Sequence, residues 1–171
     1  MPQRINISSK TFCSRQKTKM LAHSCGFTLI ELLIVMSVMG VLSGIAVPVY
    51  FNYIEKAKIA KTIAEIRTLE KEVLAFQISD NTGDLPTTLN QIGYGGMVDP
   101  WGKPYQYFNI ATLTGNGQRR DDGAGNPINT LFDLYSLGKD GTSSPSVTDM
   151  KSRDDIIYAK YGQFVGLGIG L

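Results

Sequence analysis

The chain has 171 residues and a formal net charge of +2, but its charges are unevenly placed. Five of the 17 basic residues lie within residues 1–26, where no acidic residue occurs, so the remainder carries 12 basic and 15 acidic side chains and lacks the basic excess of a nucleic-acid-binding domain. The two cysteines and the single histidine (Cys13, Cys25 and His23) all precede Phe27, so a chain cut near that point has no thiol nucleophile, imidazole base or disulfide. This composition excludes most hydrolase and redox mechanisms, and we expect no enzyme.

Residues 27–50 form an apolar run of 24 residues with one charged side chain, Glu31. As a helix this run is about 36 Å long, enough to cross a bilayer. Basic residues precede it and acidic residues follow it, so the positive-inside rule predicts a cytoplasmic N-terminus and an external remainder. A cleaved secretory signal is the alternative, but residues 48–52 offer no small-residue cleavage site.

The pattern predicts one long helix over residues 27–79, because apolar residues three or four positions apart continue after the membrane run. Its first half, residues 27–50, is apolar all round, whereas residues 51–79 carry a single apolar stripe that can pack on a domain. Asn81, Gly83 and Pro86 are expected to end the helix. The stripe consists of Ile59, Ile63, Ile66, Leu69, Val73 and Phe76.

Residues 80–171 are predicted to form a small antiparallel β-sheet domain, which places the chain in the α+β class. Tyr105 and Tyr107 occupy alternate positions, and residues 131–137 also show a two-residue alternation, as in strands with one buried face. A polar, glycine-rich loop is expected between these strands at residues 115–127. The apolar tail, residues 163–171, is expected to form a strand edge or a subunit contact.

Glu31 lies one turn into the membrane-spanning helix, where a charge costs several kcal/mol unless it is paired. The carboxylate can snorkel to the nearby interface. Alternatively, cleavage after Gly26 creates an amine at Phe27, and Glu31 of a neighbouring subunit neutralises that amine.

Two further features of the apolar run concern helix packing. Gly40 and Gly44 form a GxxxG pair, which either lets helices approach closely or has no role. Pro48 has no backbone N–H and is expected to kink or loosen the helix near Gly44.

The run GFTLIELLIV at residues 26–35, followed by Pro48 and a long helix, resembles the class III signal of type IV pilins and pseudopilins. The resemblance implies the pilin fold, a long N-terminal helix packed on a small antiparallel sheet. It implies that a prepilin peptidase cuts between Gly26 and Phe27 and N-methylates Phe27. It also gives Glu31 a role in subunit docking and Pro48 a role in assembly.

The leader implied by this cleavage, residues 1–26, departs from the family pattern. Family leaders are mostly short and carry a basic residue close to the cut, whereas Ser24 and Cys25 stand there in this chain. A start at Met20 would give a short leader but would lose all five basic residues, so the long form is preferred.

Three segments of the second half resemble the globular domain of the major pseudopilins of type II secretion. They are DPWGKPYQY at residues 99–107, FDLYSLGKDG at residues 132–141 and the run Asp154-Asp155-Ile156. Adhesive and twitching pilins usually close this region with a disulfide loop, which this chain cannot form after cleavage.

The resemblance further implies a calcium ion in the loop after the second segment, since hard cations take several oxygen ligands. The alternative is a simple turn at Asp140-Gly141 beside a solvated aspartate pair. The loop from Asp140 to Asp154 is longer than is usual in the family, so Asp149 is an alternative to Ser152 as a ligand. The implied ligands are the Leu137 carbonyl, Asp140, Ser152 and Asp154, with Asp155 adjacent.

The resemblance predicts a major pseudopilin that polymerises with itself into the periplasmic pseudopilus of a type II secretion system. Such a subunit is a single-pass protein of the bacterial inner membrane with a cytoplasmic N-terminus and a periplasmic C-terminal domain. The implied partners are a prepilin peptidase, minor pseudopilins, an inner-membrane assembly platform with a cytoplasmic ATPase, and an outer-membrane secretin. The alternatives are a type IV pilin of a surface pilus, serving motility, adhesion or DNA uptake, and a single-pass membrane enzyme or receptor.

Overall fold

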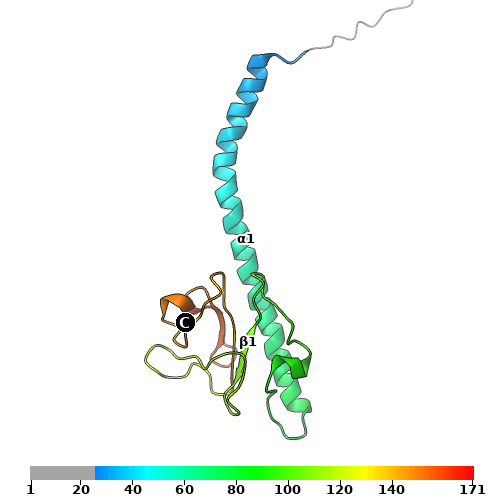
Figure 1. The fold of residues 1–171 in the computed structure, drawn as a ribbon, viewed down its shortest axis with the longest axis vertical. Helices are drawn as coiled ribbons and strands as arrows, with labels where there is room; N and C mark the ends of the chain where they lie inside the picture. The colour runs from blue at the N-terminus through cyan, green and yellow to red at the C-terminus, as the bar shows by residue number, and fades with distance from the viewer. Residues whose placement is uncertain (1–25) are drawn as a thin grey trace, which may run out of the picture. The chain divides into compact units, whose positions relative to one another are not determined.

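The computed structural model describes residues 26–171, so the expected leader lies outside the described residues except for Gly26. The chain divides into two compact units, the first ending at Ser43 and the second comprising Gly44–Leu171. One helix, α1 (Leu29–Ser79), runs through both units (Figure 1). Among the helices of residues 26–171, α1 alone is long and apolar enough to cross a membrane.

The long helix predicted from the apolar spacing is confirmed by α1, which continues through Pro48. Its last turn passes into a reversal in which the Gly83 N–H donates to the Asp80 carbonyl at 3.1 Å. Gly83 has a φ of +72°, a conformation that glycine adopts without strain. The predicted end of the helix near Gly83 therefore has a conformational cause.

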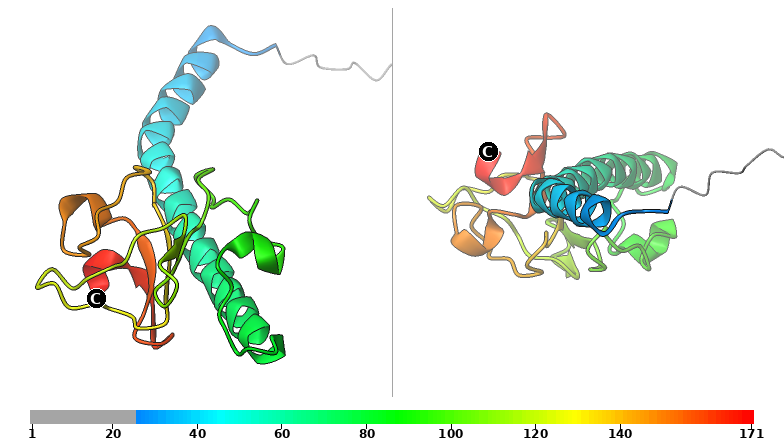
Figure 2. Two further views of the ribbon diagram at one scale, coloured as in Figure 1. Left: turned by 60° about the horizontal axis from the view of Figure 1, so that its bottom comes forward. Right: turned by 90° about the horizontal axis from the view of Figure 1, so that it is seen from above.

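The second unit contains a five-stranded antiparallel sheet with the order β2-β1-β3-β4-β5. Together with α1 this sheet confirms the α+β class, and the tail predicted as a strand edge or subunit contact forms the edge strand β5. The strands lie beside the C-terminal half of α1, drawn in green (Figures 1 and 2). The strands are β1 (Gln106–Asn109), β2 (Thr114–Gly115), β3 (Phe132–Ser136), β4 (Ile156–Ala159) and β5 (Phe164–Leu167), and the short 3-10 helices are η1 (Leu89–Ile92), η2 (Met150–Ser152) and η3 (Gly168–Gly170).

The larger hydrophobic core lies between α1 and one face of the sheet. The stripe of α1 supplies Ile66, Leu69 and Val73, which are fully buried. Phe132 of β3 stacks on Tyr158 of β4, with ring centroids 4.9 Å apart. The rest of this core consists of Leu85, Leu89, Tyr105, Tyr107, Leu134 and Ile156.

A smaller hydrophobic cluster covers the other face of the sheet and consists of Tyr135, Val147 and Ile157. Because both faces are covered, all five residues of β3 are buried, and the expected alternation of buried and exposed positions is absent there. The cover comes from the loops that precede and follow β3, and these loops carry the candidate site.

Hydrogen bonds tie the sheet domain to α1 at two aromatic side chains. The Trp101 indole N–H donates to Glu55 at 3.1 Å, and the Tyr105 hydroxyl donates to Glu65 at 2.6 Å. Both acceptors are carboxylates of α1, so these charge-assisted bonds fix the sheet against the helix. Tyr105 lies within the larger core and Trp101 packs against it, so both aromatic side chains serve the packing of the domain.

Candidate functional site

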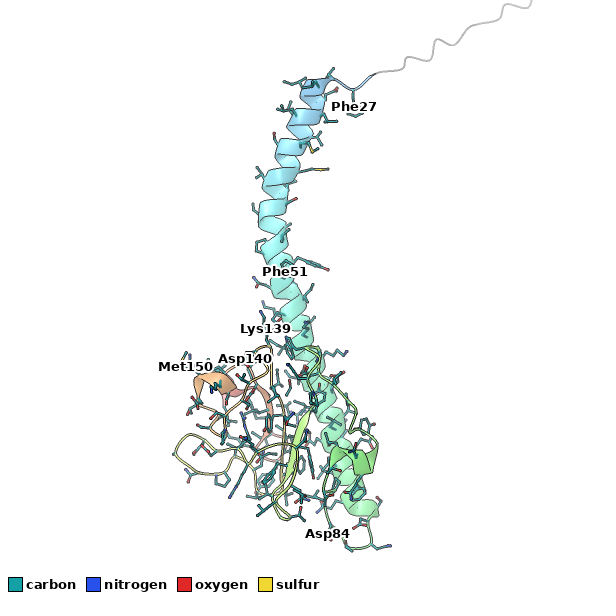
Figure 3. All side chains as sticks on the ribbon, in the orientation of Figure 1. Phe27, Phe51, Asp84, Lys139, Asp140 and Met150 are labelled. Atoms are coloured by element: carbon teal, nitrogen blue, oxygen red, sulfur yellow. The ribbon has the colours of Figure 1, made fainter. Side chains whose placement is uncertain are left out.

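The start of α1 presents apolar side chains to its surroundings on every side (Figure 3). All residues from 26 to 43 are exposed, and Leu29 is 84% exposed. Exposing large apolar side chains to water costs roughly 1.5–3 kcal/mol each relative to burying them. This helix surface therefore requires lipid or other helices around it.

The peptide bond between Gly26 and Phe27 lies before the first helical residue, Leu29. Phe27 is 82% exposed. A bond in this position is free of the helical hydrogen-bond ladder, so it can enter a peptidase in an extended form without unwinding α1. Its placement is compatible with the predicted cleavage, which remains a prediction.

Glu31 takes part in a capping box with Thr28 at the start of α1. The Thr28 N–H and hydroxyl both donate to Glu31 Oε2, at 2.9 and 2.7 Å, and the Glu31 N–H donates to the Thr28 hydroxyl at 3.3 Å. This reciprocal pattern satisfies donors that a helix N-terminus otherwise leaves free. The T-x-x-E spacing could have revealed it in the sequence. Both bonds to the carboxylate end on Oε2, which leaves Oε1 outside the cap.

Gly40 and Gly44 are open on their outer face. A Cβ added at either position meets no other atom within 4 Å. The open glycine face is therefore not filled by the chain's own described residues. Pro48 lies in the same helix and cannot donate to the carbonyl four residues earlier.

The loop after β3 brings Asp140 and Asp154 together. The Asp140 N–H donates to Asp154 Oδ2 at 2.9 Å, and Asp140 Oδ1 accepts the Thr142 N–H at 2.7 Å. Gly138 makes this approach possible, because its φ is +62° and an added Cβ would stand 2.3 Å from the Asp154 carbonyl oxygen. Two of the predicted calcium ligands are therefore neighbours, with carboxylate and carbonyl oxygens close by.

Ser152 holds a nearby turn closed through its hydroxyl, which accepts the Ser144 N–H at 3.1 Å and donates to the Ser144 carbonyl at 3.0 Å. Leu137, whose carbonyl was predicted as a ligand, packs against the smaller hydrophobic cluster. Among residues 26–171 there is no group of three or more His, Cys, Asp or Glu side chains arranged to hold a metal.

Asp155 is fully buried and paired with Arg120 from the loop between β2 and β3. The Arg120 Nη2 to Asp155 Oδ2 distance is 2.7 Å. The Ser143 hydroxyl donates to the same oxygen at 2.6 Å. The other oxygen, Oδ1, has no hydrogen-bond partner in the described part of the chain. Sequence reasoning missed Arg120, because an arginine in a polar glycine-rich loop carries no local sign of burial.

Burial raises the pKa of Asp155, while the Ser143 hydroxyl and the Arg120 guanidinium act in the opposite direction. Burial also raises the pKa of Asp133 on β3, to about 6, against the lowering effect of hydrogen bonds from Asn129 and the Arg120 N–H. The region around Arg120 therefore concentrates desolvated charge.

Comparison with known proteins gives one match to a short N-terminal motif and others that extend over most of the chain. Residues 21–47 match the family described as "Prokaryotic N-terminal methylation motif". Type II secretion system core protein G of Pseudomonas aeruginosa is 31% identical over 144 residues, which covers 72% of this chain and 89% of that protein. Core protein G of Vibrio cholerae is 26% identical over 136 residues, covering 64% of this chain and 93% of that protein.

A fimbrial relative is similar over a shorter stretch. The type IV major fimbrial protein FimA of Dichelobacter nodosus is 48% identical over 40 residues, which covers 23% of this chain and 26% of that protein. No solved structure matches this chain.

Proposed function

The chain belongs to the family of type II secretion system core protein G, the major pseudopilins, and we propose that it serves as a membrane-anchored subunit that stacks with its own copies through α1. The observation that carries this proposal is the apolar helix surface of residues 26–43, which is exposed throughout. The surface-pilus alternative is less favoured, because the similarity to core protein G extends over 72% of the chain, whereas the match to FimA covers 23%.

The exposed helix suits two environments in turn. In the bilayer its side chains contact lipid, and its backbone groups are satisfied within the helix. In a filament the same side chains contact helices of neighbouring copies, which keeps the apolar area out of water. The transfer exchanges one apolar environment for another, so the burial of apolar surface changes little and does not drive it. The energy must therefore come from outside the subunit, and the second unit need not refold.

Glu31 sets the register in which neighbouring copies of α1 stack. Its carboxylate is costly in lipid, and the capping box uses only Oε2. After cleavage at Gly26, the amine of Phe27 on an adjacent copy supplies an opposite charge for Oε1. The pairing is available only in the correct stack, so it selects one subunit register.

We expect Glu31→Ala to reduce filament yield by about tenfold or more, because a lost ion pair in a medium without water is worth over 1.4 kcal/mol. The measurement is pelleting of filaments from cells that carry the complete secretion system, with the subunit mass and N-terminal residue determined in parallel. The mass separates failed assembly from failed processing.

Thr28→Ala provides the matched control for this experiment. It removes the two capping hydrogen bonds of the Thr28 hydroxyl but keeps the bond from the backbone N–H of residue 28 and the Glu31 carboxylate. The pairing hypothesis requires Thr28→Ala to retain most of the filament yield. Normal filaments from Glu31→Ala, or equal losses from both variants, would contradict it.

The partners and location proposed for the chain follow from its family. A prepilin peptidase would process Gly26-Phe27, and an assembly platform with a cytoplasmic ATPase would supply the energy of extraction. Minor pseudopilins and an outer-membrane secretin would meet the growing filament. The subunit would reside in the inner membrane with its second unit in the periplasm, in agreement with the basic residues before the apolar run and the acidic ones after it.

Calcium binding in the loop after β3 is a second part of the proposal. The oxygen donors fit a hard cation, since Asp140 and Asp154 are already neighbours and Asp155 keeps an unpartnered oxygen, Oδ1, within the described residues. The Leu137 carbonyl and Ser152 would complete the set. A bound cation would neutralise the aspartates and tie the loop to β3.

Isothermal titration of the full chain in detergent tests this assignment. We expect Asp154→Asn to weaken calcium binding by at least about tenfold, because loss of outer-shell partners alone costs 10–100-fold at metal sites. Asp84→Asn is the control, since Asp84 is exposed and lies far from Asp140 (Figure 3). Absence of binding heat in the unmodified protein would refute the calcium site without affecting the filament proposal.

A further inference from the structure

Arg120 occupies an unusual position for an arginine. It lies in the polar loop between β2 and β3, yet it is only 1% exposed, while its neighbour Arg119 is exposed. Arginine side chains are almost never fully buried unless they are paired. The contacts of Arg120 therefore identify what this loop holds.

The guanidinium contacts two separate points of the segment after β3. Nη2 lies 2.7 Å from Oδ2 of Asp155, the residue directly before β4. Nη1 donates to the Ser144 carbonyl at 2.7 Å and to the Ser143 hydroxyl, which itself donates to Asp155. One cation therefore bridges both ends of the segment from residue 143 to residue 155.

The guanidinium is also anchored to the sheet. Its central carbon lies 4.5 Å from the centroid of the Tyr135 ring, a cation–π distance. In addition to the guanidinium, the backbone N–H of Arg120 donates to Asp133 Oδ2 at 2.9 Å. Both contacts are to β3, so the loop that carries Arg120 is fixed to the centre of the sheet.

Backbone hydrogen bonds next to Arg120 extend the connection. The Asp121 N–H donates to the Pro145 carbonyl at 3.0 Å, and the Asp121 carbonyl accepts the Val147 N–H at 3.0 Å. Val147 belongs to the smaller hydrophobic cluster with Tyr135 and Ile157. The segment from residue 143 to residue 155, which includes the predicted ligands Ser152 and Asp154, is thus connected to the loop before β3 at several points.

We propose that Arg120 is a built-in cation that positions the segment from Ser143 to Asp155, so that this segment keeps its fold when no calcium is bound. The guanidinium supplies a permanent positive charge in a fixed fork, which matches a carboxylate and a carbonyl at the same time. Calcium can neutralise Asp140 and Asp154, whereas Asp155 has its counter-charge from the protein itself. Calcium binding at Asp140 and Asp154 is compatible with this inference, whereas dependence of the segment's fold on calcium is not.

Arg120→Met tests the role of the charge with a side chain of similar length. It leaves Asp155 buried without a counter-ion, and removal of one partner from a buried pair is strongly destabilising. In the full chain, held in detergent with a chelator of calcium, we expect the unfolding temperature to fall by roughly 10 °C. Arg119→Met, the exposed neighbour, is the matched control and should leave the unfolding temperature nearly unchanged.

Two further measurements keep the inference testable if Arg120→Met fails to fold. Arg120→Lys keeps the charge but loses the fork, and its Val147 and Asp121 amides should exchange with deuterium at least about tenfold faster than in the unmodified protein. In the double variant Arg120→Met/Asp155→Asn the uncompensated charge is gone, so it should recover a large part of the lost unfolding temperature.

Three results would overturn the proposal. One is an Arg120→Met protein as stable as Arg119→Met. Another is unchanged amide exchange in Arg120→Lys. The third is an unmodified protein in which the chelator alone exposes the Val147 amide, since the segment would then depend on calcium and not on Arg120.

Discussion

Leu33 and Leu69 are leucines of the same helix, yet Leu33 is 57% exposed and Leu69 is fully buried. Leu69 packs in the larger core between α1 and the sheet, whereas the side chains of residues 26–43 are all exposed. Within residues 26–171 nothing covers the first region, so we expect its partners to be lipid or other copies. A helical run that is apolar on every side predicts that the helix needs partners, but it does not identify them. Where the helix also has a polar face, the single apolar stripe predicts that the partner is the chain's own domain.

Leu69→Ala should have the largest effect on the second unit. Removal of a fully buried leucine costs about 2–5 kcal/mol, through lost burial and the cavity that remains. Urea unfolding of the full chain in detergent, followed by the fluorescence of Trp101, the only tryptophan, measures this cost. Insertion into the membrane should be unaffected. A loss below about 1 kcal/mol would mean that the core between α1 and the sheet is looser than its burial indicates.

The comparison between the two regions extends to their carboxylates. Glu31 is exposed in the first unit, whereas Asp133 in the second unit is fully buried. Burial raises the pKa of Asp133 to about 6 from an ordinary value of 3.8. The folded state therefore holds this proton more tightly than the unfolded state, and the contribution of Asp133 to stability falls as pH rises from about 4 to about 6.

Asp133→Asn removes this titration. The free energy of unfolding of the variant, relative to the unmodified protein, should rise by about 2 kcal/mol between pH 4 and pH 7. Urea unfolding at pH 4, 5, 6 and 7 measures the difference, and the comparison cancels groups that titrate in both proteins. A constant difference across this range would show that Asp133 ionises normally in the folded state.

Local features of the fold could be predicted from the sequence. Spacing alone gives α1, its exposed half and its buried stripe, because these depend on residues three or four positions apart. The expected alternation in β3 is absent because the loops before and after it cover its second face. Tyr135 is buried through Val147, a residue that adjoins it only in the folded chain. Burial of this second face depends on contacts between residues far apart in the sequence, and the spacing of apolar residues within a strand cannot predict them.

The residues of the candidate sites also fall into those that local spacing predicts and those that it does not. Thr28 and Glu31 are three residues apart, and the capping spacing is visible in the sequence. Arg120 and Asp155 are 35 residues apart, and neither has a neighbour that predicts the pair. The calcium ligands came from family resemblance, and their assignment stays a prediction. Resemblance could not supply Arg120, because that residue lies outside the three segments that carry the likeness.

Leu33→Ala should have the smallest effect on the second unit and provides the sharpest test of the comparison. The substitution is the same as Leu69→Ala, but Leu33 makes no contact that buries it within the described chain. We expect the free energy of unfolding reported by Trp101 to change by less than about 0.5 kcal/mol. Filament yield should fall, since in the proposed stack the lost side chain would face neighbouring helices. If Leu33→Ala destabilised the second unit as much as Leu69→Ala, the first half of α1 would have its partner within the subunit, and stacking through that half would have to be abandoned.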